Sequence, residues 1–499
     1  MIRNTPKYLQ MSAVTTPSSR RLLTRGGLLL PTAGRMSWTM LAIVLLLAWA
    51  PLPFGSVTPF WKAVLASGSL LLLAVAALTH PQRFAWPPAG LPPLGLAAAL
   101  FVIVCLWVFL QAMPFMPSAW HHPAWALSAE ATGTHGTSSI SINPGGTLAD
   151  MISLLGIGAI FLLALTEARD AVKARILVGS TAAIALAYAV YGLIVFLSGN
   201  GSVAWVSKTA YLQSLTSSFI NRNTYAVYAG LGMVSALALL LSTLAPVFSS
   251  RGRSAERWKK IISYLTGSGG LWLLAVLFGL SAMLMTGSRA GTAASLSGAG
   301  VMAGLYLAAR RTRTGTLVAF MLAALVAGTA FLALSGDMLV DRLTETGRAW
   351  EARNTIYELT LVAIGDHLWL GSGYGSFEDI FRMYAGLSET YGPTFKAAHS
   401  VYLETVLELG LPAALALFGA VACCLWLAIR GMLTRRRDRI YPALAIGATL
   451  IVALQGAVDF AIQTPAITML YAVLLAVGVA QSVSSASATA RRVSRSGDH

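Results

Sequence analysis

Residues 91–113, LPPLGLAAALFVIVCLWVFLQAM, contain no charged side chain and are long enough to cross the hydrocarbon core of a bilayer as one helix. Apolar runs of this kind recur along most of the 499 residues, of which 56% are hydrophobic and only 11% are charged. A soluble domain carries about twice that share of charged residues. The sequence therefore predicts an all-α polytopic membrane protein.

The apolar runs predict about twelve transmembrane helices. Short polar or basic segments separate most of the runs, which is typical of a chain that crosses the bilayer repeatedly. The predicted spans are residues 37–54, 57–79, 91–113, 148–166, 174–197, 223–245, 263–285, 289–309, 316–335, 401–429, 440–459 and 463–482.

The basic residues show which side of the membrane each connection faces. Alternation of the spans places all the arginine-rich segments on one side, and positive loops face the cytoplasm. Both termini are therefore predicted to be cytoplasmic. The same distribution assigns the net charge of +16 to topology rather than to nucleic-acid binding. The segments are Arg20-Arg21, Arg251 to Lys260, Arg310 to Arg313, Arg435 to Arg439 and Arg491-Arg492.

This topology divides the chain into four predicted parts. A cytoplasmic basic tail covers residues 1–36, and a second cytoplasmic tail covers 483–499. N-terminal transmembrane helices cover 37–147 and include an outward loop at 114–147. A transmembrane core covers 148–482 and includes outward loops at 198–222 and 336–400. The last loop has a helical apolar pattern, and a long loop with its own helix is usually functional; the pattern runs through Trp350, Ile356, Leu359 and Ile364.

The cysteines and histidines do not predict a metal site. Cys105, Cys423 and Cys424 all fall inside predicted spans, where a thiol behaves as a small apolar side chain. The histidines lack the spacing of metal ligands, and no cysteine faces outward. No metal and no other cofactor is expected.

The segment Ala398-His399-Ser400-Val401-Tyr402-Leu403-Glu404 carries a histidine into an apolar run at the end of the longest loop. A single histidine at a membrane interface is often only a polar anchor. Here Glu404 and Glu408 follow at helical spacing without a cationic neighbour in sequence, and carboxylates are costly against lipid. We therefore expect both, and Asp459 near the end of its span, to point into the bundle or an aqueous cleft.

Three arginines work against the positive-inside pattern because they fall on the outer side. Arg289 lies in Thr286-Gly287-Ser288-Arg289-Ala290-Gly291, where Ser288 can cap a helix and the arginine can reach the headgroups. A guanidinium beside a helix N-terminus also suits phosphate oxygens, which is the interpretation we favour. Arg222 lies between Asn221 and Asn223, a composition typical of turns and caps. Arg353 shares the largest loop with several carboxylates, most of which are expected to form solvated ion pairs.

Together these segments resemble the O-antigen ligase and O-antigen polymerase superfamily of bacterial envelope glycosyltransferases. The resemblance covers roughly residues 150–482, although this chain has Ser400 where the family often has Asn. The matching segments are Phe219 to Ala226, Thr286 to Gly291, Arg353 ahead of Leu370-Gly371-Ser372-Gly373-Tyr374-Gly375, His399 to Glu404 with Glu408 to Pro412, and Asp459 to Ala466.

The resemblance implies an architecture similar to the C-type glycosyltransferases, with a large periplasmic loop in the bacterial inner membrane. It also implies an undecaprenyl-diphosphate-linked glycan as donor and no metal. His399, Arg289 and Arg222 would be the catalytic residues. Further residues are expected to bind substrate: Arg353, Asn221, Asn223, Ser288, Tyr374, Tyr402, Glu404 and Asp459.

We interpret the site as one for glycosyl transfer, with His399 as the base and Arg289 and Arg222 holding the diphosphate, and with inversion at the anomeric carbon. The segment at Asp459 favours an exopolysaccharide or O-antigen polymerase or ligase. A ligase to lipid A-core and a protein O-oligosaccharyltransferase remain alternatives, so the acceptor is a glycan, lipid A-core or protein; a chain-length regulator is a possible partner. About twelve spans also suit a secondary transporter or flippase, but transporters keep their polar residues near the bilayer midplane.

Overall fold

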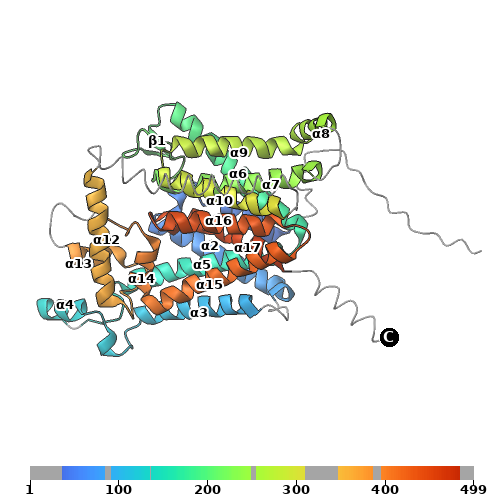
Figure 1. The fold of residues 1–499 in the computed structure, drawn as a ribbon. Coiled ribbons are helices and arrows are strands. Elements are labelled where there is room, and N and C mark those ends of the chain that lie inside the picture. The colour runs from blue at the N-terminus through green and yellow to red at the C-terminus, as the bar shows by residue number, and fades with distance from the viewer. Residues whose placement is uncertain are drawn as a thin grey trace, which may run out of the picture.

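The structure is a computed structural model that describes residues 36–84, 92–134, 136–248, 254–309, 347–385 and 395–483. Most of these residues are helical, and the long helices lie side by side along one direction (Figure 1). The helix α12 crosses one end of this bundle (Figure 1). The prediction of an all-α protein is thus confirmed for the described part of the chain.

Several of the described helices can cross a membrane by length and composition. The seven that are both long and apolar are α2 (Pro59–Thr79), α3 (Pro92–Ala112), α5 (Pro144–Glu167), α6 (Ala171–Leu197), α7 (Arg222–Phe248), α15 (Leu411–Thr434) and α17 (Pro465–Ser482). Shorter apolar helices are α1 (Trp38–Trp49), α9 (Ser268–Met285) and α16 (Ile440–Gly456), and α10 (Arg289–Ala308) packs against α7 and α16. The predicted span at 316–335 lies outside the described residues, so the total of twelve stays a prediction.

Small residues allow the central helices to approach closely. An added Cβ on Gly298 of α10 would lie 2.4 Å from the carbonyl oxygen of Gly447 on α16. An added Cβ on Gly230 of α7 would overlap the side chain of Ser295 on α10. Close backbone contact through small residues is how membrane helices associate, because burial of apolar surface gives them little advantage over lipid.

One end of the bundle, which we call the loop end, carries the irregular elements. It holds α4 (Ala124–Thr132), α12 (Gly347–His367), α13 (Phe377–Ala385), α14 (Val401–Leu409) and a hairpin of β1 (Ser202–Val203) with β2 (Val206–Ser207) (Figure 1). The 3₁₀ turns η1 (Phe54–Ser56), η3 (Ser118–Trp120) and η5 (Ala461–Gln463) connect helices that meet there. The helix α12 confirms the helical pattern predicted inside the longest loop.

The prediction of one span over residues 401–429 is wrong. The helix α14 ends at Leu409, Gly410 adopts a φ of 75°, and α15 begins at Leu411. The turn at 371–375 packs across this break: Ser372 N donates to Leu407 O at 2.9 Å, and an added Cβ on Gly410 would lie 2.5 Å from Trp369 O. The apolar run continues through the break, so hydropathy alone does not distinguish two helices from one.

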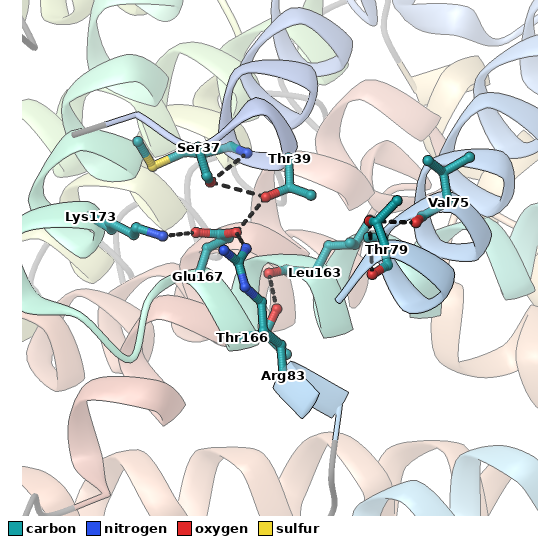
Figure 2. Close-up of polar contacts among 11 residues, drawn as sticks. Ser37, Thr39, Val75, Thr79, Arg83, Leu163, Thr166, Glu167 and Lys173 are labelled. Carbon is teal, nitrogen blue, oxygen red and sulfur yellow. Dashed lines mark hydrogen bonds and ion pairs between the residues drawn. The ribbon is translucent and has the colours of Figure 1, made fainter. Parts of the chain in front are cut away.

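The other end of the bundle is held by polar contacts around Glu167, which closes α5 about 36 Å from the start of that helix. The Glu167 carboxylate is 3% exposed and contacts Thr39 of α1, Lys173 of α6 and Arg83, whose Nη1 lies 2.7 Å from Oε1 (Figure 2). Arg83 belongs to η2 (Pro81–Phe84). This cluster joins the N-terminal helices to the core, and α8 (Ser254–Leu265) also lies at this end (Figure 1).

Candidate functional site

His399 lies at the loop end in an unusual backbone conformation directly before α14. Its φ is 53°, a left-handed value that costs a non-glycine residue about 1–2 kcal/mol. Two contacts hold the segment in place. The Tyr357 hydroxyl of α12 donates to His399 O at 3.1 Å, and Ala398 N donates to Glu404 Oε2 at 2.8 Å. The backbone that carries the imidazole is therefore held by both α12 and α14.

The predicted burial of Glu404 and Glu408 is confirmed, since their exposed fractions are 6% and 5%. Glu404 also accepts a hydrogen bond from the Gln463 side chain of η5. Glu408 accepts a hydrogen bond from Phe377 N, the first residue of α13, at 3.1 Å. Both carboxylates thus brace the segments around His399.

Asp459, which follows α16, lies beside His399. His399 Nδ1 lies 3.6 Å from Asp459 Oδ1, slightly longer than a hydrogen bond, and Nδ1 has no hydrogen-bond partner among the described residues. Asp459 is 2% exposed and accepts a hydrogen bond from Asn223 Nδ2 at 2.6 Å. A carboxylate beside Nδ1 favours the tautomer with the proton on Nδ1, which leaves the lone pair of Nε2 available as a base.

Asn223 connects this pair to Arg222 at the start of α7. Asn221 Oδ1 accepts a hydrogen bond from Asn223 N at 2.7 Å, which confirms the cap-like role expected for this composition. The Arg222 guanidinium lies over the Tyr211 ring, with Cζ 5.6 Å from the ring centroid. Arg222 Nη1 donates to Ser214 Oγ at 3.4 Å.

Arg289 is the first residue of α10 and its side chain is exposed. Ser288 Oγ accepts a hydrogen bond from Gly291 N at 3.2 Å, so Ser288 caps the helix as predicted. In the preceding turn Gly287 has a φ of 66°, and an added Cβ there would lie 3.7 Å from Arg222 Nη1. The structure therefore brings the Arg222 guanidinium to the turn that carries Arg289.

The other predicted site residues do not hydrogen-bond to the His399–Asp459 pair within the described chain. The Tyr402 hydroxyl donates to Ala453 O at 2.9 Å. Tyr374 is half-buried, its N donates to Gln111 Oε1 at 3.3 Å, and burial raises the pKa of its hydroxyl well above the ordinary value. Arg353 lies within α12, and its side chain is outside the described structure.

The sequence did not predict the residues that hold the candidate site residues in place. Tyr357 contacts the backbone of His399, and Gln463 contacts Glu404. Because each contact joins residues that are far apart along the chain, a single sequence contains no pattern that reveals it. Lys208 lies on the loop that precedes Arg222, and burial lowers the pKa of its amine. The available signal for Lys208 was its place in the same predicted outward loop as Arg222.

The arrangement combines an imidazole with a carboxylate beside it, and a guanidinium lies at the same end of the bundle of apolar helices. An oriented imidazole can take a proton from a hydroxyl group. Guanidinium groups at helix starts can hold phosphate oxygens. Groups suited to taking a proton and to holding an anion are thus brought to one end of the bundle from distant parts of the sequence.

The comparisons with known proteins agree with this chemistry. Residues 274–418 match the family model described as O-antigen ligase. The matched range contains Arg289, Arg353 and His399, whereas Arg222 and Asp459 lie outside it. A search of curated proteins gives no match. The matched segment of this chain is thus similar to the O-antigen ligase family, and seven of the described helices are long and apolar enough to cross a membrane.

Proposed function

We propose that this protein transfers a glycan from an undecaprenyl-diphosphate carrier to an acceptor hydroxyl on the outer face of the bacterial inner membrane. The observation that carries the proposal is the meeting of His399, Asp459 and Asn223 at one end of the bundle, with Arg222 next in sequence to Asn223. These groups come from the segments before α14, after α16 and at the start of α7. A base beside an anion-binding arginine is what this transfer requires.

In the proposed reaction, Nε2 of His399 takes the proton of the acceptor hydroxyl while its oxygen bonds to the anomeric carbon. The bond from that carbon to the diphosphate oxygen breaks, and the diphosphate leaves with the electron pair. Asp459 stabilises the imidazolium that forms. Arg222 and Arg289 stabilise the negative charge that develops on the leaving group. Direct displacement inverts the anomeric centre.

The positions of the buried ionisable groups support a transferase over a secondary transporter. In the described chain the buried carboxylates are Glu167 at one end of the bundle and Glu404, Glu408 and Asp459 at the other. A transporter of about twelve spans would be expected to keep such groups near the midplane. Their absence from the middle of the described helices favours chemistry at one surface.

Among transferases, we favour an O-antigen or exopolysaccharide polymerase or ligase, because the segment at Asp459 contributes directly to the site. A lipid A-core ligase and a protein O-oligosaccharyltransferase use the same donor chemistry. The glycan profile of a deletion strain separates them: a polymerase deletion loses long polymer, a ligase deletion accumulates unattached glycan on its carrier, and a protein transferase deletion leaves unglycosylated protein.

The test of the base is His399→Ala, expressed in that deletion strain and assayed for product with membrane-inserted protein measured in parallel. We expect product to fall by at least about 100-fold while the inserted amount is unchanged. A normal glycan profile from this variant would exclude His399 as the base. Arg289→Lys is also expected to impair the reaction, because a point charge does not replace a two-pronged guanidinium. Wild-type activity with lysine would reduce Arg289 to an interface anchor.

A further inference from the structure

Lys208 is held at the loop end by an ordered hairpin. After α6 ends, Asn200 adopts a φ of 54° and is 6% exposed, and its Nδ2 donates to the carbonyl oxygens of Leu212 and Ser214 at 2.6 and 3.0 Å. The strands β1 and β2 pair as Ser202 with Ser207 and Val203 with Val206. Lys208 follows β2 directly, and its N donates to Gly201 O at 3.0 Å. The side chain is thus presented by a fixed backbone.

Two cations converge on one residue of this segment. Lys208 Nζ donates to Ser214 O at 2.7 Å and to Asn200 Oδ1 at 2.9 Å. Arg222 Nη1 donates to Ser214 Oγ at 3.4 Å, and an added Cβ on Gly287 would lie 3.9 Å from the same Oγ. The amine, the guanidinium and the turn before Arg289 therefore surround Ser214.

No carboxylate of the described chain forms an ion pair with Lys208 or Arg222. Other partly buried cations differ: Lys62 pairs with Asp150 at 2.6 Å, and Arg83 pairs with Glu167. Two like charges that share a neighbour repel one another, and partial burial weakens the screening by water. Burial also lowers the pKa of Lys208, because the charged amine loses part of its hydration. A bound anion would relieve both costs.

We propose that Lys208 binds the diphosphate of the donor together with Arg222, so that the loop between α6 and α7 forms one wall of the leaving-group site. This rests on the proposed function and names a residue outside the segments that resemble the family. An ammonium has three donors, and the two bonds observed leave one for a phosphate oxygen. Two cations that contact the same residue suit two linked phosphates better than a single monoanionic group.

The competing source of the same chemistry is an ordinary phospholipid, because lysine and arginine at an interface also reach headgroup phosphates. Full-length protein in phosphatidylcholine nanodiscs distinguishes the two. Undecaprenyl diphosphate is added at increasing amounts in one arm and phosphatidylglycerol in the other, and binding is read from protection of the hairpin amides of residues 200–214 in hydrogen exchange. We expect protection at far lower amounts of the diphosphate. Equal affinity for both lipids would overturn the proposal.

Three variants isolate the charge. Lys208→Gln keeps an N–H donor for Asn200 and Ser214 but removes the charge, so we expect about 10- to 100-fold weaker diphosphate binding. Lys208→Arg keeps the charge and should bind within about 3-fold of wild type. The matched control is Lys62→Gln, which removes a cation that already pairs with Asp150 and should bind as wild type.

The outcomes separate this inference from the proposed function. Wild-type binding by Lys208→Gln, or equally weak binding by Lys208→Gln and Lys208→Arg, overturns the role of the charge. If Arg222→Gln loses diphosphate binding while Lys208→Gln keeps it, the present proposal fails alone. If Arg222→Gln and Lys208→Gln both bind the diphosphate as wild type does, the diphosphate site of the proposed function is refuted together with the present proposal.

Discussion

Acidification should release residues 118–142 from α12, because two stacked imidazoles lie at their contact. His122 is 5% exposed, and its ring stacks on that of His367 at a centroid distance of 4.8 Å and an interplanar angle of 20°. His122 Nδ1 accepts a hydrogen bond from Ala124 N at 3.1 Å, so the neutral ring carries its proton on Nε2. That Nε2 is buried without a hydrogen-bond partner in the described chain. A second proton would therefore place a charge in a site that lacks an acceptor for it.

The size of the effect follows from the pKa of His122. Burial, and then the neighbouring His367, lower this pKa to about 4, against about 6.5 in an unfolded chain. Burial also lowers the pKa of His367, which Asp366 opposes. A lowered pKa means that the neutral form stabilises the docked state fully above pH ~6.5, and that this stability is lost as the pH falls toward 4. At pH 5, protonation of His122 alone lowers the equilibrium constant for docking by a factor of roughly 30, which is about 2 kcal/mol.

Hydrogen exchange of residues 118–142 at pH 7.5 and 5.0, corrected for the intrinsic rate, measures this change in full-length protein in nanodiscs. His122→Phe keeps a ring that can stack on His367 but cannot charge, so the pH step should shrink to the part that His367 contributes. The control is His80→Phe. His80 follows the last residue of α2, away from the loop end, so this variant should keep the pH step of the wild type. A full step in His122→Phe, or none in the wild type, would refute the assignment.

Three further predictions address the base, the opposite end and the break between α14 and α15. Asp459→Asn should lower kcat by about 100-fold or more with little change in the KM for donor, because the imidazole loses its orienting charge; a proportional rise in KM would instead indicate a substrate contact. Glu167→Ala should lower the free energy of unfolding by about 1–2 kcal/mol in thermal unfolding, since the cations that lose their partner remain partly exposed to water; an unchanged melting temperature would contradict this. Gly410→Ala should cost about 3 kcal/mol or more, because its φ is 75° and the added Cβ would lie 2.5 Å from Trp369 O. Gly365→Ala, where the added Cβ meets no atom within 4 Å, is the matched control and should be close to neutral.

The sequence predicted those features that depend on the cost of placing polar groups in an apolar setting. Glu404, Glu408 and Asp459 had to avoid lipid, and all are buried inside the protein. Ser288 carried the composition of a helix cap and is one. Both kinds of inference use only local chemistry, which a single sequence contains.

Features that depend on contacts between distant segments could not be predicted. Asp459 and Asn223 are 236 positions apart and lie at hydrogen-bonding distance only because α7 and α16 pack together. The helix break at Gly410 is imposed by the turn at 371–375, whose amides bond to the end of α14. The segment Gly410-Leu411-Pro412 inside an apolar run is compatible with either a continuous or a broken helix, and packing decides between them.

The starts of three helices add a local positive potential around Arg222, Arg289 and His399, beyond the side-chain charges. The helices α7, α10 and α14 all begin there, directly at or after Arg222, Arg289 and His399. The first backbone N–H groups of a helix lack a carbonyl partner within the helix and carry a partial positive charge. An anion held at this end is therefore stabilised by backbone as well as by side chains. It follows that removing either arginine should weaken diphosphate binding without abolishing it. Complete loss from one substitution would mean that the side chain alone carries the site.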